Sequence, residues 1–551
     1  MIQPQHGRKQ GIFAPLGVPT FRNIWLASLI SNTGALIQGV GSAWVMAEIS
    51  TADKVAMVQT ATFLPMALLA VPAGAIADMY DRRKSQIASL AIAVAGALAL
   101  AIFSLIGWIT PWVLLGLCFF IGCGMAVFGP SWQSSVGEQV PPPLLPQAVA
   151  LNGISYNVAR SFGPAVGGMI VAFAGAAAAF AVNFLCYFPM LLALLAWRRM
   201  PLPTRLPPER LGRAMMSGLR YIVHMQPVRT AIARSLVTGM LGSSLLSLMP
   251  LVARHMLGGT AQIFGILLGF FGLGAVAAIF ILERVRRFGN EKVVKGCSIA
   301  LAASVACLAL SHSLILSSAV LLVAGAAWMI QVTTVNIAVQ LFVPRWVTGR
   351  AIAALNATVA GGIALGSVIW GVVAEQHGTA AALMTAAALL LVSPVIGLFL
   401  PIADRESAAR SLDEPLADPE VNMAITGRSG PIIIELGYRV PSAQARDFYD
   451  LMRRIQRIRA RNGAYDWSLS RNINDPDRWV ERYRCPTWHD YLRQRNRVTE
   501  EEMAVQQKAR DFLTGGEDIR VERWLERPFG SVRWRAESPD RGGYDISAPG
   551  N

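Results

Sequence analysis

The stretch Gly74-Ala-Ile-Ala-Asp-Met-Tyr-Asp-Arg-Arg-Lys84 places two acidic and three basic residues within seven positions. Apolar sequence flanks it on both sides, and between Ser85 and Ala159 the only charged residue is Glu138. A membrane-spanning helix requires about 20 mostly apolar residues, and each flank provides that length. The charged stretch is therefore predicted to be a polar turn between two membrane spans.

The same pattern extends over most of the 551-residue chain, of which 54% is hydrophobic and 15% charged. This charged fraction is well below that of soluble domains. Twelve apolar stretches of membrane-spanning length are predicted at residues 22–47, 55–78, 86–108, 111–136, 146–172, 174–197, 228–253, 262–284, 292–311, 314–340, 349–374 and 379–401.

Charge is divided unevenly along the chain. Residues 1–404 hold 24 Lys/Arg and 10 Asp/Glu, whereas residues 405–551 hold 25 and 24. The positive excess thus lies in the apolar part, which argues against nucleic acid as a partner. Within that part, the basic residues gather in alternate connections, as cytoplasmic loops do. We therefore expect an integral protein of a prokaryotic inner membrane with both termini in the cytoplasm.

The apolar part contains an internal repeat. The pattern Val140-Pro…Ala150-Leu-Asn152 recurs as Val343-Pro…Ala354-Leu-Asn356, and at an offset of 204 residues Gly167 falls on Gly371. Transporters are commonly built from such repeats, with the substrate site between them. The predicted parts are a six-helix half at 1–197, a cytoplasmic loop at 198–225 and a second six-helix half at 226–402.

Two motifs resemble those of a known family. Gly74-x-x-x-Asp78-x-x-Asp-Arg-Arg-Lys84 is similar to the loop between spans 2 and 3 of the major facilitator superfamily, with Asp81 where Gly is usual. Gly163-Pro-Ala-Val-Gly-Gly168 resembles a span-5 signature of its exporters. With FRNIWLASLISNTGALIQGVGSAW in span 1 and a cytoplasmic tail, residues 14–402 resemble the enterobactin-exporter-like, transmembrane secretion effector branch.

This resemblance implies an all-α polytopic membrane protein with twelve transmembrane helices in two six-helix halves, the major facilitator fold. It also implies a secondary transporter. The Arg-x-x-Gln-Gly signature that many proton-coupled relatives carry in span 4 is missing.

A cytoplasmic gate is expected where spans 2 and 11 end. A carboxylate at Asp78 can accept hydrogen bonds from the open N–H groups of a helix N-terminus, and span 11 begins at Gly349-Arg350. We expect Asp78 to cap that helix when the cytoplasmic side is closed, and Gly74 to let the helices approach; otherwise Asp78 is an ordinary interfacial acid. The predicted gate residues are Gly74, Asp78, Arg82, Arg83, Gly349 and Arg350.

Span 5 carries a small-residue face formed by Gly163, Pro164, Gly167 and Gly168, which permits close helix contact. A similar glycine stripe in span 8, at residues 265–272, is its expected partner across the two halves. Arg160 is the only basic residue between Lys84 and Arg198. Because burying a charge in a membrane is costly, Arg160 is expected either to attract an anionic substrate or to pair with Glu138.

Proton coupling requires a titratable group in the membrane, and Glu138 is the deepest candidate. Burial would raise its pKa, whereas a bond to Arg160 would lower it, and the sequence leaves both open. Further candidates for the substrate pathway are uncharged polar residues within spans: Asn32, Gln38, Gln133, Asn157, Asn336 and Gln340.

The soluble C-terminal part begins with a polar linker at 403–428. Strands are predicted near 431–440, 465–470, 478–485 and 519–525, with a helix from Ser442 to Asn462 and a helical region at 486–513. The order βαββαβ indicates a ferredoxin-like α+β domain at 429–540, followed by a flexible tail at 541–551. It resembles dimeric α+β barrel domains of cofactor-free monooxygenases, which implies a homodimer.

The predicted function is a secondary active exporter of small organic molecules such as siderophores, drugs or secreted metabolites, working by alternating access and proton-driven antiport. One alternative is a transporter–enzyme or transporter–sensor fusion whose C-terminal domain binds or modifies the substrate. Another is a membrane anchor whose tail recruits partners. The expected partners are the lipid bilayer, a small-molecule substrate and the proton. None of the six cysteines forms a C-x-x-C pair, so no metal site and no cofactor is expected.

Overall fold

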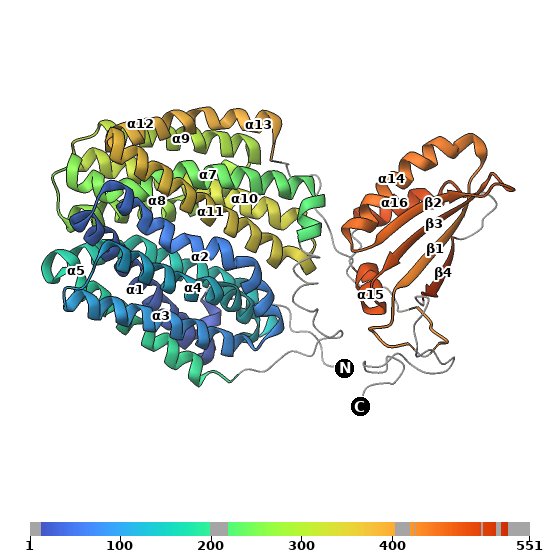
Figure 1. The fold of residues 1–551 in the computed structure, drawn as a ribbon, viewed down its shortest axis with the longest axis horizontal. Helices are drawn as coiled ribbons and strands as arrows, with labels where there is room; N and C mark the ends of the chain where they lie inside the picture. Colours follow the sequence, from blue (N-terminus) through green and yellow to red (C-terminus); the bar gives the residue numbers. More distant parts are fainter. Residues whose placement is uncertain are drawn as a thin grey trace. The chain divides into compact units, whose positions relative to one another are not determined.

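The computed structural model describes residues 13–198, 219–402, 419–423, 425–496, 500–513 and 519–526 (Figure 1). The chain forms two compact units. The first contains Met1–Leu211, Thr230–Val339 and Ile352–Asp404; the second contains Gly212–Arg229, Gln340–Ala351 and Arg405–Asn551. Only parts of the predicted loop 198–225 and linker 403–428 are described, and the predicted tail 541–551 lies outside the described residues.

Long helices that run alongside one another dominate the first unit (Figure 1). They are α1 (Pro19–Ile49), α2 (Ala52–Met79), α3 (Arg82–Leu105), α4 (Pro111–Ser135), α5 (Leu145–Ala196), α7 (Gln226–Leu251), α8 (Ala261–Arg286), α9 (Asn290–Leu310), α10 (Leu314–Phe342), α11 (Arg345–His377), α12 (Thr379–Val392) and α13 (Ile396–Phe399). We call α1–α5 the N-terminal half and α7–α13 the C-terminal half.

Within the described residues, nine helices are long and apolar enough to cross a membrane, whereas twelve spans were predicted. The stretches expected at 146–172 and 174–197 belong to the single element α5. Gly175 interrupts this element with a φ of +79°, a conformation that glycine adopts more readily than other residues. The predicted boundary between two helices therefore coincides with the break inside α5.

Helix ends that carry arginines define one end of this unit. The Arg83 side chain, at the start of α3, donates hydrogen bonds to the carbonyls of Leu194 (2.8 Å) and Leu195 (2.7 Å) near the end of α5. Arg82 donates to the carbonyl of Ser134 in α4 (2.7 Å). These bonds satisfy carbonyls that a helix C-terminus leaves open. We call this end, where α2 stops and α3 begins, the basic end, and the other the opposite end.

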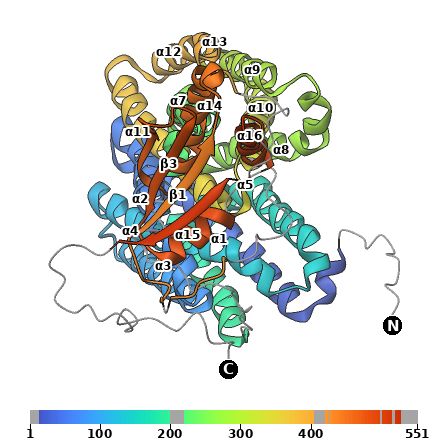
Figure 2. The same cartoon turned by 90° about the vertical axis from the view of Figure 1, so that its right-hand side faces the viewer.

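In the second unit, a four-stranded antiparallel sheet has the order β2-β3-β1-β4. The elements are β1 (Ile432–Arg439), α14 (Ala445–Arg461), β2 (Tyr465–Arg471), β3 (Arg478–Cys485), α15 (Trp488–Asn496), α16 (Glu500–Arg510) and β4 (Arg520–Leu525). Figure 2 shows β1 and β3 side by side, and Figure 1 shows α14 and α16 together beside the sheet. The four strands lie where the sequence predicted them.

The helices of this unit differ in detail from the prediction. Ser442 does not cap a helix: its hydroxyl donates to Asp477 (2.7 Å), and α14 begins three residues later at Ala445. The single helical region expected at 486–513 is divided into α15 and α16. The apolar periodicity was read correctly, because Phe448, Met452 and Ile455 of α14 are buried in the core of this unit.

The short helical stretch 219–224, which precedes α7, also belongs to the second unit. Tyr221 is 1% exposed, and the guanidinium of Arg461, at the end of α14, lies 5.4 Å from the centre of its ring. Arg461 also donates to the sulfur of Met225 (3.1 Å) and pairs with Glu502 of α16. The soluble domain thus contacts the segment that leads into the C-terminal half.

Candidate functional site: the contact between the two helical halves

Helices α5 and α8 join the two halves through glycine backbones. A methyl group added to Gly168 would lie 2.6 Å from the carbonyl oxygen of Ala261 and 2.9 Å from Cα of Gly265. One added to Gly272 would lie 2.5 Å from the carbonyl oxygen of Arg160. Only glycine permits such an approach, which confirms the predicted pairing of span 5 with the glycine stripe of span 8.

The two other predicted glycines of α5 have a different partner. Cβ atoms on Gly163 and Gly167 would meet Leu36 and Ile37 of α1 at 3.0 and 2.9 Å. Because α1 and α5 both belong to the N-terminal half, these glycines bring helices together within that half rather than across the two halves. The expectation that the whole face lies between the halves is therefore wrong for Gly163 and Gly167.

A second crossing joins α2 to α11. The hydroxyl of Thr60 donates to the carbonyl of Ala364 (2.8 Å). A Cβ on Gly371 would lie 2.7 Å from Cβ of Ala56 and 3.0 Å from Cα of Asp53. Gly371 is the repeat partner of Gly167, so both equivalent glycines mark a close helix approach.

Both crossings lie toward the opposite end of the helices. Asp53 and Ala56 are in the first turns of α2, and Gly168 lies closer to the break of α5 at Gly175 than to its start at Leu145. Toward the basic end, Cβ atoms added to Gly74 in α2 and to Gly153 in α5 would meet no described atom within 4 Å. Among the described residues, these glycines make no close helix contact near the basic end.

The expected gate contact between Asp78 and Arg350 at the basic end stays a prediction. The close approach expected at Gly74 is absent among the described residues, and a Cβ on Gly349 would likewise meet none of their atoms within 4 Å. The side chain of Asp78 lies outside the described residues, while Arg350 is half-buried. The bonds of Arg82 and Arg83 described above stay within the N-terminal half.

Arg160 and Glu138 do not pair with each other. Glu138, whose side chain is 4% exposed, pairs with Arg82 at 2.9 Å instead. The guanidinium of Arg160 lies 5.3 Å from the ring centre of Phe271 in α8, a cation–π contact across the two halves. The expectation that Arg160 pairs with Glu138 is therefore wrong, because Glu138 pairs with Arg82, a residue distant in sequence.

The uncharged candidates are divided among different environments. Gln38 is buried and bonds to Asn183 of α5, so it packs within the N-terminal half. Asn32 and Asn157 bond within their own helices, to the hydroxyl of Ser28 (3.2 Å) and the carbonyl of Gly153 (2.8 Å). Gln133 and Gln340 are exposed.

Asn336 is the candidate that lies at a cavity. This cavity of about 20 Å³ lies between α7, α10 and α11 and is lined by Ser235, Thr238, Gln331 and Asn356 as well. Gln331 donates to Thr238 (3.0 Å) and to Ser298 (3.2 Å). Sequence reasoning missed these partners, although Asn356 belongs to the repeated Ala-Leu-Asn pattern that identified the two halves.

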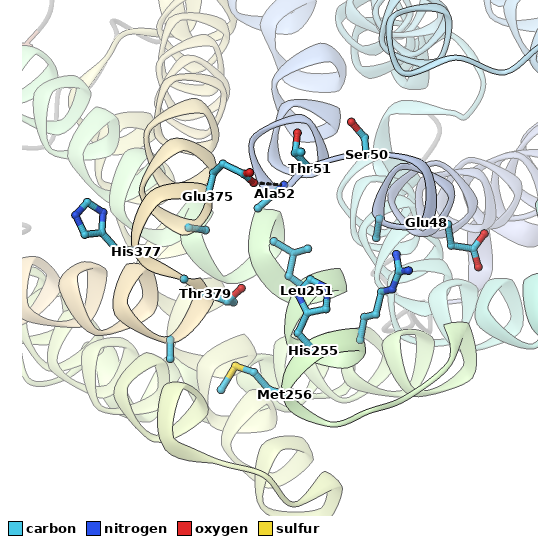
Figure 3. Close-up of a pocket in the computed structure, with 15 residues that line it drawn as sticks. Glu48, Ser50, Thr51, Ala52, Leu251, His255, Met256, Glu375, His377 and Thr379 are labelled. Carbon is cyan, nitrogen blue, oxygen red and sulfur yellow. Dashed lines mark hydrogen bonds between the residues drawn. The ribbon is translucent and has the colours of Figure 1, made fainter.

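A larger pocket of about 600 Å³ lies at the opposite end, between α1, α2, α7, α11 and α12 (Figure 3). Its charged and titratable lining residues are Glu48, Arg254, His255, Glu375 and His377. The backbone N–H of Ala52 donates to Oε2 of Glu375 (2.8 Å), and the indole of Trp44 donates to Oε1 of Glu48 (2.7 Å). No cluster of three or more His, Cys, Asp or Glu side chains in the described residues is arranged to hold a metal ion.

The soluble domain has its own buried polar network around Glu481, which is 0% exposed. Glu481 accepts hydrogen bonds from Tyr438 (2.8 Å), Arg459 (3.0 Å) and Trp467 (3.0 Å). Burial, and then the Glu481 charge, raise the pKa of Tyr438 well above its usual value. Burial lowers the pKa of His489, whose backbone N–H bonds to the carbonyl of Gly427 (2.9 Å).

Solved structures with the same helical arrangement are membrane transporters. A bacterial homologue of the human lysosomal transporter Spinster, in an inward-facing and occupied conformation, matches with a TM-score of 0.56 and 13% identity, over 73% of this chain and 99% of that one. The nucleoside transporter NupG matches with a TM-score of 0.57 and 12% identity, over 69% and 100%. At such identities the likeness shows the fold alone.

The family follows from the sequence match. The chain belongs to the transmembrane secretion effector family, which matches residues 10–529. The match thus extends beyond residues 14–402, where the resemblance was first noted, into the soluble domain. The Staphyloferrin A transporter of Staphylococcus aureus (strain NCTC 8325 / PS 47) is 29% identical over 272 residues, which is 48% of this chain and 66% of that protein.

Proposed function

We propose that the chain is a secondary active exporter that moves small organic molecules across the cell membrane by alternating access. The observation that carries this proposal is the position of the close contacts between the halves. The contacts described at Gly168–Gly265 and Gly371–Asp53 lie toward the opposite end, whereas Gly74 and Gly153 make no such contact with any described residue. In alternating access, close contact between the two halves on one side of the membrane belongs to one of the states.

In this proposal all twelve predicted stretches cross the inner membrane, and the basic end faces the cytoplasm. The close contacts at Gly168 and Gly371 then lie toward the outside. The Asp78–Arg350 contact closes the cytoplasmic side in this proposal. Charge reversal in Asp78→Arg should abolish transport, and intact transport would contradict the gate.

A siderophore or another secreted metabolite is the substrate we propose. The support is the partial match to the Staphyloferrin A transporter and the family's description as a secretion effector. The lone Arg160 in the membrane-spanning part of α5 adds a positive charge that suits a substrate with an anionic group. Metabolite profiling of medium from cells with and without the chain tests this directly.

We also propose that proton-driven antiport powers this export; the two helical halves support a secondary transporter, and the experiment below tests the coupling ion. Uptake of the identified metabolite into inverted vesicles should require an inwardly acidic gradient and stop when a protonophore collapses it. Uptake that continues without a gradient would contradict antiport while leaving export intact.

For the soluble domain we propose a ferredoxin-like layer that forms a homodimer, with the sheet order β2-β3-β1-β4 as support. A second function is that this domain binds or modifies the substrate, as in a transporter–sensor or transporter–enzyme fusion. The buried Glu481 network favours a defined structural or binding role over a passive tail. Export that is unchanged after removal of the domain would argue against the second function.

A further inference from the structure

The first turn of α2 is held by a side chain from the other half of the protein. A helix leaves the N–H groups of its first turn without partners inside the helix. The residue before α2, Thr51, gives no side-chain cap, and its hydroxyl bonds to Asp53 instead. Glu375 of α11 supplies the missing acceptor through the 2.8 Å bond to the N–H of Ala52 (Figure 3).

The packing below this bond fixes where the carboxylate lies. Gly371, one turn before Glu375 in α11, lies so close to Asp53 and Ala56 that a Cβ would clash at 2.7–3.0 Å. A negative charge at a helix N-terminus is stabilised by the open N–H groups and by the helix dipole. Glu375 thus combines a charge-assisted bond with a close backbone contact at the same crossing.

Other charged and titratable groups line the same pocket as Glu375. They are Glu48 of α1, Arg254 and His255 of the turn after α7, and His377 of α11 itself; Asp53 and Lys54 directly follow Ala52 in α2. Glu48 is the matched comparison, because it is also an exposed glutamate of the same pocket. Its hydrogen-bond partner, Trp44, lies on its own helix rather than in the other half.

We propose that Glu375 is a latch that holds the opposite ends of the two halves together, and that loss of its negative charge by substitution releases them. This inference rests on the proposed alternating-access function. Glu375 acts here by positioning α2, not by touching the substrate.

Hydrogen exchange measured by mass spectrometry on the full-length protein in lipid nanodiscs tests the latch without any substrate. Compared with wild type at neutral pH, Glu375→Gln should speed exchange at residues 52–60 and 361–371 by about two- to fivefold, the range expected for one charge at a helix N-terminus. Glu48→Gln should leave both regions unchanged.

Three outcomes overturn the latch: unchanged exchange in Glu375→Gln, an equal effect of Glu48→Gln, or faster exchange confined to the first turn of α2. The last result would mean local fraying of one helix end. A Glu375→Asp variant, which keeps the charge on a shorter side chain, should lie between wild type and Glu375→Gln. Exchange that behaves as expected in a protein that moves no metabolite would uphold the latch and reject the proposed transport function.

Discussion

Gly168→Ala should hinder closure at the opposite end more than any other single methyl group added to α5. The new Cβ would lie 2.6 Å from the Ala261 carbonyl, whereas ordinary contacts begin at 3.4 Å. Helices α5 and α8 must then separate by about 0.8 Å at this point. Because the obstacle is backbone, no side-chain rotation can relieve it.

Inserting a methyl group into a tight contact costs about 1–3 kcal/mol. If that cost falls only on the closed arrangement, the conformational equilibrium shifts by about 5- to 150-fold away from it. The turnover of the reconstituted protein with its identified substrate should fall at least fivefold. Hydrogen exchange at residues 165–172 and 261–269 should rise by a similar factor.

The control is Gly153→Ala on the same helix, where the added Cβ would meet no described atom within 4 Å. Alanine also has a higher helix propensity than glycine, so this variant should match or exceed wild type in thermal stability and transport. If Gly168→Ala behaves like Gly153→Ala in both assays, the close α5–α8 contact does not control the cycle.

Two further predictions concern other parts of the chain. Arg234→Met removes the buried partner of Glu291 and should lower the free energy of unfolding by about 3 kcal/mol, because breaking a buried ion pair leaves an unpaired charge. The control is Lys295→Met, which removes a more exposed partner of Glu291 at 3.5 Å and should cost less than about 1 kcal/mol. Equal shifts in melting temperature for the two variants would contradict this prediction. Burial lowers the pKa of His489, so the unfolded chain takes up the proton first, and the stability present above about pH 6.5 is lost as the pH falls. Between pH 7.5 and 5, the melting temperature of the soluble domain should therefore fall less steeply in His489→Gln than in wild type. Parallel curves would contradict a lowered pKa at His489.

The sequence predicted helices and strands well because periodicity and chain length determine them locally. The strand at 478–485 coincides with β3, and the break at Gly175 separates the two apolar stretches as expected. Helix periodicity also placed small residues on shared faces of α5. It does not reveal which neighbour meets each face, so Gly167 was assigned to the other half although it packs against α1.

Most of the wrongly predicted side-chain contacts involve partners that are distant in sequence. Glu138 was expected beside Arg160 because both lie in the same apolar region, yet Arg82 reaches it from the start of α3. The sequence singled out Glu138, not Glu375, as the titratable candidate. The bond of Glu375 to Ala52 joins residues 323 positions apart, and no local pattern indicates such a contact.

The contact between Tyr221 and Arg461 affects how truncated proteins should be interpreted. A chain that stops near residue 403 loses Arg461 and leaves the Tyr221 ring without its cover, directly before α7. A change in export then has two origins to separate: the uncovered Tyr221 ring, and the loss of a sensing or enzymatic role of the soluble domain. Adding Tyr221→Ser to the shortened chain separates them, because export should recover only where the uncovered ring is the cause.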